Sequence, residues 1–275
     1  MKPAAFDYLR PDSAAEALEC LAQRGEEARV MAGGQSLMPM LNMRLLKPAI
    51  IVDIGMLPEL DYARVDGGML EIGAATTQAS LQAWPELPTR APLLEMIMPH
   101  VGHFQTRNRG TVCGSLCHAD PSSELPLCLA ALNGQVRLAS TAGTRTLTAA
   151  EFQTGMLSTA RRADEIVLAA RFPVARAGDA YAFDEFTRRH GDFAIVAVAA
   201  VVGEAGVRLA VGGVADRPAI LALDAAESET LDDALNEFAW ELGGFDDIHA
   251  SARYRRELVR RLGKRVIEEA RAYQG

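Results

Sequence analysis

The segment "RNRGTVCGSLCHADPSSELP", residues 107–126, contains two glycines, two cysteines, one histidine and two prolines between stretches with helical patterns. Glycine and proline weaken the interior of helices and strands, and polar side chains are costly to bury without partners. The segment is therefore expected at a functional surface rather than in a core. Three interpretations are open: a catalytic cysteine and histidine, a metal site, or a cradle for phosphate groups.

Composition narrows the class of protein. The chain has 275 residues, of which 49% are hydrophobic and 23% charged, which is typical of a globular protein with one large or two to three smaller domains. The sequence contains no run of about 18 apolar residues, the length that a membrane-spanning helix needs. The N-terminus lacks the basic and apolar regions of a secretory signal, so we expect a cytoplasmic location. The net charge of -8 disfavours nucleic acid as a partner.

One basic stretch, residues 251–273, requires a separate interpretation because it is rich in arginine. Its apolar residues are spaced by four, which places them on one face of a helix. They are Leu258, Leu262, Val266 and Ala270. We therefore predict an amphipathic helix on the surface or facing another subunit, rather than a helix that binds nucleic acid.

The cysteines do not have the spacing of a metal site. Cys113, Cys117 and Cys128 do not form paired Cys-x2-Cys motifs. Cys20 and Cys128 lie in apolar helical patterns, where cysteine commonly packs as a small hydrophobic residue. We predict neither a zinc or iron–sulfur site nor disulfides.

The order of predicted elements divides the chain into three parts. Ser13 precedes Glu16 by three residues, a capping-box spacing that predicts the start of the first helix. In residues 1–57 we predict a helix (11–25), a strand (28–34), a short helix and a strand (49–55). In residues 58–175 we predict strands at 69–77, 135–140 and 165–173, with helices at 80–84, 93–101 and 124–133. After a linker at 173–180, we predict strands at 192–202 and 207–215 and helices at 228–242 and 250–273.

Two separate segments contain glycine next to hydroxyl residues. They are "AGGQS" (32–36), after a predicted strand, and "GTVCGS" (110–115), before a predicted helix. Glycine lets successive N–H groups point at an anion, and serine or threonine hydroxyls can donate as well. A pair of such loops could hold a pyrophosphate, although each alone is more often a tight turn. The first is not a Rossmann fingerprint, because the G-x-G-x-x-G spacing is absent.

The motifs at 32–36, 107–126 and 186–200 ("FTRRHGDFAIVAVAA"), in this order, resemble the FAD-binding medium subunit of the molybdenum hydroxylases. That group includes carbon monoxide, xanthine, nicotine and caffeine dehydrogenases, and the resemblance covers essentially the whole chain. It implies an α+β fold of the vanillyl-alcohol-oxidase/PCMH type, with two FAD-binding subdomains (1–57 and 58–175). A C-terminal antiparallel sheet with helices (176–275) would follow.

The resemblance also implies which residues contact FAD. The first pyrophosphate loop would be Ala32, Gly33, Gly34, Gln35 and Ser36, and the second would be Thr111, Val112, Cys113, Gly114 and Ser115. Glu124 would lie near the ribityl or ribose hydroxyls, Gly102 would line the site, and Phe193 would lie beside the isoalloxazine ring.

This sequence departs from the family pattern at several positions. Cys113 replaces a family glycine. Asp184 stands where some members carry a lysine, so we do not expect Asp184 to make the contact of that lysine. Gln35 occupies the position where a histidine for covalent flavin attachment would be expected, so we predict noncovalent FAD.

Cys117 and His118 could form a nucleophile and its base, but neighbouring side chains diverge on an extended backbone. We expect His118 to form a hydrogen bond within its loop. We therefore predict no catalytic side chain and no metal ligand in this chain.

The resemblance implies an electron-transfer flavoprotein subunit. A large molybdopterin-binding subunit and a small 2Fe-2S subunit would be its partners, in a dimer of heterotrimers, and electrons would leave for an external acceptor. One alternative is a stand-alone FAD reductase or oxidase of the same fold. Its best acid-base candidates, His100, His103 and His190, have no carboxylate or serine arrangement that the sequence reveals. A second alternative, a scaffold without flavin, leaves both glycine segments unexplained.

Overall fold

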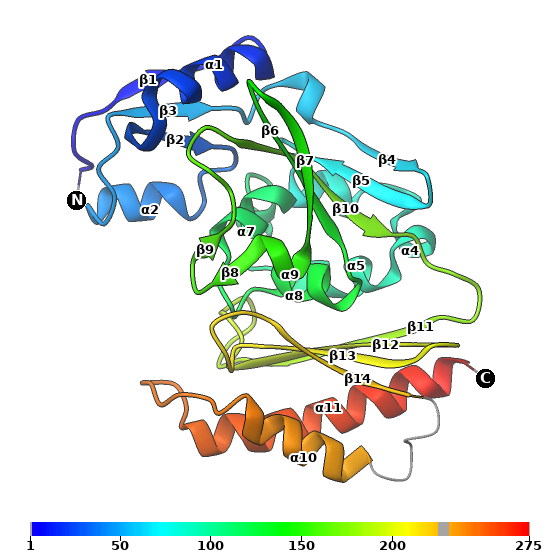
Figure 1. Ribbon diagram of the computed structural model, residues 1–275. Coiled ribbons are helices and arrows are strands. Elements are labelled where there is room, and N and C mark those ends of the chain that lie inside the picture. Colours follow the sequence, from blue (N-terminus) through cyan, green and yellow to red (C-terminus); the bar gives the residue numbers. More distant parts are fainter. Residues whose placement is uncertain (1, 225–230, 275) are drawn as a thin grey trace.

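The computed structural model describes residues 2–224 and 231–274. Three sheets follow one another along the chain and lie in layers from the N-terminal to the C-terminal part of the molecule (Figure 1). A short two-stranded hairpin accompanies the second sheet. The combination of one parallel and two antiparallel sheets with helices confirms the predicted α+β class.

The first sheet is parallel and has the strand order β1-β3-β2. Helix α1 begins where the Ser13 hydroxyl accepts a hydrogen bond from the Glu16 N–H (3.2 Å), and it ends at Gly25, whose φ is +51°. The predicted helices and strands of this region are confirmed, and β1 is an additional strand. The elements are β1 (Asp7–Leu9), α1 (Ala14–Arg24), η1 (Gly25–Glu27), β2 (Ala28–Met31), α2 (Leu37–Asn42) and β3 (Ile50–Asp53).

The second sheet is antiparallel, with the order β4-β5-β10-β6-β7. Its strands are β4 (Ala63–Asp66), β5 (Met69–Gly73), β6 (Gln135–Ser140), β7 (Gly143–Thr148) and β10 (Ile166–Pro173), and the hairpin is β8 (Gln153–Gly155) with β9 (Ser158–Thr159). Its short helices are η2 (Pro58–Leu60), α3 (Gln78–Gln82), α4 (Leu87–Arg90), α5 (Pro92–Ile97), η3 (Met98–His100), α6 (Phe104–Arg107), α7 (Val112–His118), α8 (Glu124–Ala131) and α9 (Ala149–Phe152).

Helix α8 lies at the centre of the molecule, and every one of its residues is buried. It packs against α5 and α7 on one side and against the third sheet on the other. Cys128 in this helix is fully buried, as expected of a small hydrophobic residue. Buried residues of the first two sheets and of α8 belong to one hydrophobic core.

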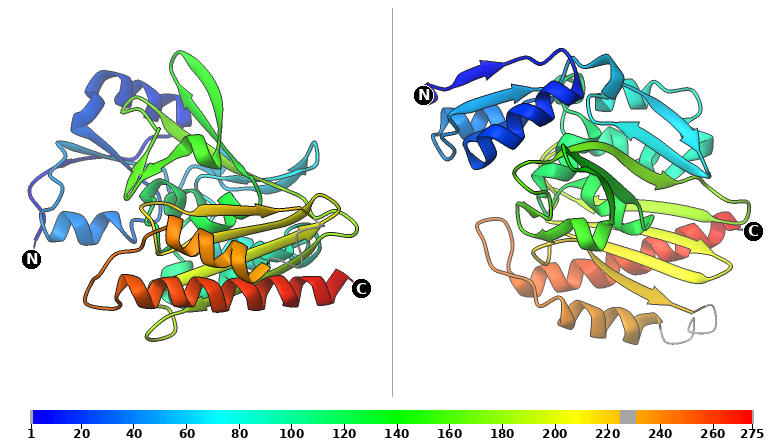
Figure 2. Two further views of the ribbon diagram at one scale, coloured as in Figure 1. Left: turned by 60° about the horizontal axis from the view of Figure 1, so that its bottom comes forward. Right: turned by 45° about the horizontal axis from the view of Figure 1, so that its top comes forward.

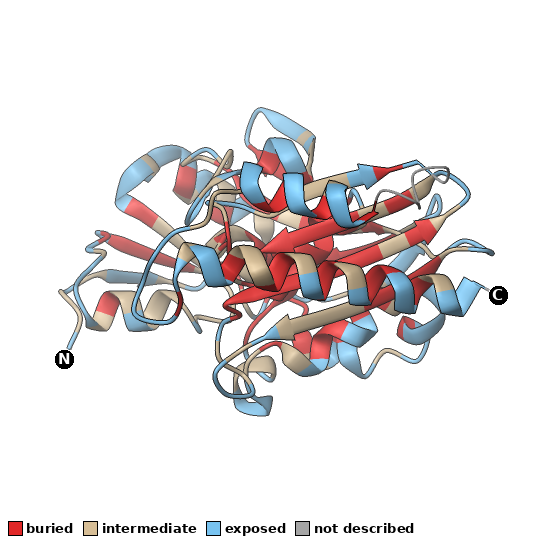
Figure 3. Cartoon of the chain, turned by 90° about the horizontal axis from the view of Figure 1, so that it is seen from below, coloured by how far each residue is buried: buried red, intermediate tan, exposed pale blue. Residues whose placement is uncertain are grey.

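The third sheet is antiparallel, with the order β11-β12-β13-β14. Helix α11 runs along its outer face beside α10 (Figure 2), and α8 covers the inner face. The predicted apolar stripe of α11 is confirmed: Leu258, Leu262, Val266 and Ala270 are buried against the sheet, while the opposite face is exposed (Figure 3). The elements are β11 (Ala180–Phe186), β12 (Val196–Gly203), β13 (Gly206–Gly212), β14 (Ala219–Leu223), α10 (Leu231–Glu241) and α11 (Ala252–Gln274).

Several predicted boundaries differ from the structure. The strands predicted over 28–34 and 69–77 end early, at Met31 and Gly73. The strand predicted over 192–202 begins only at Val196, because residues 187–195 form the turn that enters β12. The helix predicted from residue 228 is α10, and positions 228–230 lie outside the described residues. None of the described helices has the length and apolar character needed to cross a bilayer.

Candidate flavin site

A cleft of about 970 Å³ lies between the first two sheets and the turn that enters β12. Its wall comes from the β2–α2 connection, from α7 and the start of α8, from the β8–β9 hairpin, and from residues 191 and 193. This volume is at the upper end of the range of about 300–1,000 Å³ for small-molecule and cofactor sites. The cleft is therefore large enough for a dinucleotide.

The first glycine segment forms an open turn between β2 and α2. Gly34 has a φ of +71°, in the region that favours glycine. Among the described residues, none accepts a hydrogen bond from the N–H groups of Gly34, Gln35 or Ser36. The Gln35 side chain donates to the carbonyl oxygen of Gly33 (3.3 Å). The turn thus presents free backbone donors to the cleft, as an anion site requires.

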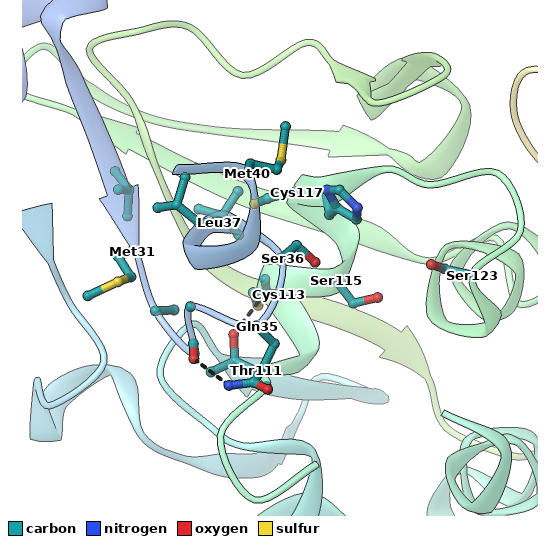
Figure 4. A pocket seen from close by; sticks show the side chains of 18 of the residues that line it. Met31, Gln35, Ser36, Leu37, Met40, Thr111, Cys113, Ser115, Cys117 and Ser123 are labelled. Atoms are coloured by element: carbon teal, nitrogen blue, oxygen red, sulfur yellow. Dashed lines mark hydrogen bonds between the residues drawn. The ribbon is translucent and has the colours of Figure 1, made fainter. Parts of the chain in front are cut away.

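The two glycine segments touch at Gly33. A Cβ atom on this residue would lie 2.1 Å from the carbonyl oxygen of Arg109 and 2.7 Å from the Cα of Gly110. Such distances leave no room for a side chain. Glycine is thus required at position 33 because two backbones meet there, and Gln35 and Ser36 lie beside Cys113 and Ser115 (Figure 4).

The second glycine segment is not a loop before a helix, as the sequence predicted, but the start of helix α7. Thr111 is the N-cap residue, and its hydroxyl accepts from the Gly114 N–H (3.0 Å). Val112 does not line the cleft: its side chain is fully buried, and its N–H donates to the Thr76 carbonyl oxygen (3.3 Å). The predicted backbone contact of Val112 with the pyrophosphate is therefore not supported.

The Cys113 side chain points away from the cleft. Its thiol is buried and lies 3.5 Å from the carbonyl oxygen of Ile72 in β5, to which it donates. Burial raises the pKa of the Cys113 thiol, so it stays protonated. Cys113 borders the cleft, but its thiol is hydrogen-bonded to β5, so the residue replaces a family glycine without offering a free sulfur to a cofactor.

Cys117 and His118 both line the cleft, but they occupy the last turn of α7 and not an extended loop. Burial raises the pKa of the Cys117 thiol to about 11, which keeps it from acting as a thiolate near neutral pH. The hydrogen bond predicted for His118 is absent: no described residue bonds to its ring. The site therefore lacks a catalytic cysteine and histidine pair.

Glu124 lies at the start of α8, where its side chain borders the cleft and is 4% exposed. Burial is the main cause that raises its pKa to about 8, and the charges of Glu185 and Asp120 raise it further, against the lowering effect of its own backbone N–H. No described side chain donates a hydrogen bond to its carboxyl group.

One of the histidines considered for acid-base chemistry, His100, has a carboxylate nearby, which the sequence did not reveal. His100 Nδ1 lies 3.0 Å from Glu185 Oε1, although 85 residues separate them. The His190 ring lies 6.3 Å from that of His100 and 6.4 Å from that of His103, measured between centroids. These residues lie behind Gly191 and Gly102, which line the cleft.

Gly102 and Phe193 both reach the cleft, as predicted. Gly102 has a φ of +53°, and Phe193 is 56% exposed. Of the predicted contact residues, the structure thus gathers all except Val112 around one cleft.

Several residues that line the cleft were missed, because no sequence motif marks them; some flank the first glycine segment, and others come from segments distant in sequence. They include Arg29, Met31, Leu37, Met40, Met43, Gln78, Thr106, Leu157, Ser158, Thr159, Arg161 and Gly191. Arg29 and Arg161 are the cationic members of this set. Within residues 2–224 and 231–274, no group of three or more histidine, cysteine, aspartate or glutamate side chains is placed to hold a metal ion.

The cleft fits FAD by three structural criteria. The glycine contact at position 33 gives a backbone cradle, the free N–H groups of the first turn suit a pyrophosphate, and the apolar methionine and leucine side chains suit flat rings. Chemically the site can bind and orient a cofactor, but it offers no activated nucleophile.

Sequence and structure comparisons agree with this geometry. Residues 4–175 match the family described as the FAD binding domain in molybdopterin dehydrogenase, and residues 181–270 match the CO dehydrogenase flavoprotein C-terminal domain. The chain is 36% identical to the nicotine 6-hydroxylase medium subunit of Paenarthrobacter nicotinovorans, over 99% of each chain. It is 30% identical to the carbon monoxide dehydrogenase medium chain of Hydrogenophaga pseudoflava, over 98% of each.

Solved structures show the same fold. Quinoline 2-oxidoreductase from Pseudomonas putida 86 superposes with a TM-score of 0.90 at 34% identity, over 98% of each chain. A Cu,Mo-CO dehydrogenase structure gives a TM-score of 0.93 at 30% identity, over the full length of both chains.

Proposed function

Since this chain belongs to the family of FAD-binding medium subunits of molybdenum hydroxylases, we propose that it transfers electrons between a partner subunit and an external acceptor. Bound FAD would accept electrons from the 2Fe-2S clusters of a small subunit, and a large molybdopterin-binding subunit would oxidise the substrate. Flavin supplies the ability to take up electrons singly or in pairs. The protein's own residues bind, orient and shield it.

We propose the following division of roles within the cleft. The N–H groups of residues 34–36 would hold the pyrophosphate, supported by Ala32, Gly33 and the backbone and hydroxyl groups of Thr111, Cys113, Gly114 and Ser115. Glu124 would face the ribityl or ribose part, and Gly102 and Phe193 would flank the ring. Arg29 and Arg161, on the same wall, would offset the phosphate charge. Residues 1–57 and 58–175 would be the two FAD-binding subdomains, and residues 176–275 the C-terminal domain.

The assembly is part of the proposal. The named relatives are medium subunits or chains of larger enzymes, which supports a complex with a large and a small subunit here. We propose a dimer of heterotrimers in the cytoplasm. Copurification of the tagged chain from its native host, followed by mass determination of the complex, tests both the partners and their ratio.

The observation that carries the proposal is the turn at residues 34–36, which lines the cleft and whose N–H groups have no acceptor among the described residues. We expect the purified chain to bind FAD noncovalently at a ratio of about one to one. Absorption spectra before and after acid precipitation measure the ratio and the linkage. A colourless chain that takes up no added FAD would contradict the proposal.

The stand-alone reductase or oxidase is the second candidate, and the contact between His100 and Glu185 is the observation in its favour. We expect the isolated FAD-loaded chain to oxidise no organic substrate of the complex, while its flavin becomes reduced once the partner subunits and that substrate are added. Alanine at His103, His118 or His190 should change this reduction rate by less than about tenfold, or 1.4 kcal/mol in barrier. Substrate turnover by the isolated chain would favour the stand-alone enzyme.

A further inference from the structure

We propose that the mouth of the cleft beside Phe193 admits a small, negatively charged electron acceptor, which the guanidinium groups of Arg107 and Arg188 attract. The inference rests on the proposed function, because it requires FAD in the cleft. It specifies the charge of the external acceptor and the surface by which that acceptor approaches. We call this surface the cationic rim, and it consists of residues 102–107 and 187–193.

Two segments far apart in the sequence form the cationic rim. Each supplies part of the cleft wall: Gly102 and Thr106 from the first, and Gly191 and Phe193 from the second. A Cβ atom on Gly191 would lie 2.5 Å from His103 Cε1 and 3.0 Å from the carbonyl oxygen of Gly102. The two segments are therefore in direct contact at the edge of the cleft.

Two phenylalanine side chains of the cationic rim are exposed. Phe104 is 65% exposed and Phe193 is 56% exposed, although Phe193 also lines the cleft. Since Phe193 is both part of the wall and open to solvent, it marks the mouth of the cleft. Apolar rings beside a few polar groups are typical of sites that bind small molecules.

The arginines of the cationic rim are not neutralised. Arg188 is exposed, and within residues 2–224 and 231–274 its guanidinium group has neither a hydrogen bond nor an ion pair. Arg107 donates to the carbonyl oxygens of Val101 (3.1 Å) and Gly102 (3.3 Å), and no carboxylate of the described residues pairs with it. Arginine keeps its charge in proteins, so both positions carry a full positive charge.

The acids nearby are engaged with other partners. The cationic rim contains three arginines and one aspartate, so its net charge is +2 with histidine neutral, whereas the whole chain has a net charge of -8. The pairs that occupy the acids are Asp192 with Arg189 (3.0 Å), Glu185 with His100 (3.0 Å) and Asp184 with Arg265. The cationic rim is thus a local positive region on an acidic protein.

Charge of one sign beside a concave site raises the rate at which oppositely charged small molecules reach it. The chain and the phosphates of FAD would otherwise repel an anion. The two cations flank the mouth of a cleft, which favours a small acceptor over a protein surface. In the transfer, one reduced flavin gives up two electrons to the acceptor and returns to water the protons it gained on reduction. No bond to the protein forms or breaks.

The test measures the reoxidation of flavin in the full-length FAD-loaded chain, after anaerobic reduction, by stopped-flow absorbance. The probes are ferricyanide, an anion, and hexaammineruthenium(III), a cation, and two ions of either take up the two electrons. Raising the ionic strength from about 0.01 to 0.5 M should lower the rate constant for ferricyanide by about fivefold. The net charge of the chain alone predicts the opposite, a rise with salt.

Arg188→Glu reverses one charge of the cationic rim. At low ionic strength it should slow ferricyanide by about tenfold and speed hexaammineruthenium(III), while Arg188→Lys should stay within about twofold of the unaltered chain. Arg176→Glu is the matched control, because Arg176 is an exposed arginine before β11, about 20 Å from the other end of that strand. It should leave both rates within about twofold. FAD content should be the same in all these proteins.

A second measurement tests whether a partner subunit covers the cationic rim instead. In the copurified complex, Arg188→Cys should react with a hydrophilic maleimide as fast as Arg176→Cys, with the label located on this chain by mass spectrometry. Protection of position 188 alone would show that a protein occupies the rim, which would overturn the inference.

A ferricyanide rate that rises with salt, or that is unchanged in Arg188→Glu, would also overturn the inference while FAD binding itself stood. If Arg188→Glu lost FAD, the salt dependence of the unaltered chain and the rate of Arg188→Lys would still decide. Failure of the unaltered chain to bind FAD would instead overturn the proposed function, and this inference with it.

Discussion

The turn at residues 32–36 and the helix start at residues 110–115 have similar compositions, yet their backbones differ. The first lines the cleft, and within the described part of the chain the N–H groups of residues 34–36 have no acceptor. In the second, the Val112 N–H already donates to the Thr76 carbonyl oxygen, and the Gly114 N–H donates to the Thr111 hydroxyl. Glycine next to a hydroxyl residue therefore does not by itself define an anion site; the hydrogen bonds already made decide what remains for a ligand.

The difference has a local cause. Thr111 has an extended backbone and caps α7 with its side chain, whereas Ser36 has a helical backbone and makes no such bond at the start of α2. A side-chain cap satisfies a donor that would otherwise be free. We infer that the first segment contributes donors to FAD, while the second mainly supplies a rigid surface against which the first is packed.

Gly33→Ala should have the largest effect, because the new Cβ would lie 2.1 Å from the Arg109 carbonyl oxygen and would force the two segments apart. We expect FAD affinity to fall by about two orders of magnitude, or about 2.7 kcal/mol, in fluorescence titrations. Gly155→Ala is the control, since its Cβ would meet nothing closer than 3.4 Å. Equal affinities in the two variants would show that the segments need not touch.

Cys113→Gly should reduce stability more than cofactor binding. It removes a buried side chain that packs against β5 and introduces glycine near the start of a helix, so we expect the free energy of unfolding to fall by about 2 kcal/mol. FAD affinity should stay within about tenfold, because the sulfur points away from the cleft. Denaturant unfolding and FAD titration of the same preparation separate these effects, and a large loss of affinity with unchanged stability would refute this orientation of the side chain.

Thr111→Val should have the smallest effect. It keeps the shape of the side chain but removes the hydroxyl that accepts from Gly114, at a cost of about 1 kcal/mol in unfolding free energy. Thr146→Val, on the exposed side of β7, should change stability by less than about 0.5 kcal/mol. If Thr111→Val instead abolished FAD binding without loss of stability, the hydroxyl would be a direct ligand, and the two segments would be more alike than their backbones indicate.

The elements that the sequence predicted well are those with strong local patterns. Helix α1 has its capping serine, β6 was predicted at its observed ends, and the buried stripe of α11 follows from its spacing. The strands that were missed include β1 and β9, which have only 3 and 2 residues, but also β7, β11 and β14, which have 5 to 7. Pairing with neighbouring strands defines them, and their composition alone does not. Helix α7 was missed because its glycine and polar residues disfavour a helix until the Thr111 cap and packing on β10 stabilise it.

The candidate site was only partly visible in the sequence for a related reason. The first glycine turn is continuous in sequence and was recognised together with Gly102, Glu124 and Phe193. Arg161 and the contact between His100 and Glu185 depend on which distant segments the fold brings together. No local pattern reports such pairs. The raised pKa of Glu124 likewise follows mainly from its burial, which cannot be read from its neighbours in the chain.

The contacts of Arg255 limit how segments of this protein can be exchanged with those of a relative. Its buried guanidinium at the start of α11 donates to the carbonyl oxygens of Ile195 and Gly213 and to Asp247, which ties the C-terminal helix to the turn that carries Phe193. The two matched family regions meet near residue 180, yet the cleft takes part of its wall from each. A chimaera that exchanged only one of these regions would combine the cleft wall of one parent with the Arg255 contacts of the other. We therefore expect that the two regions must be exchanged together for the cleft to keep its shape.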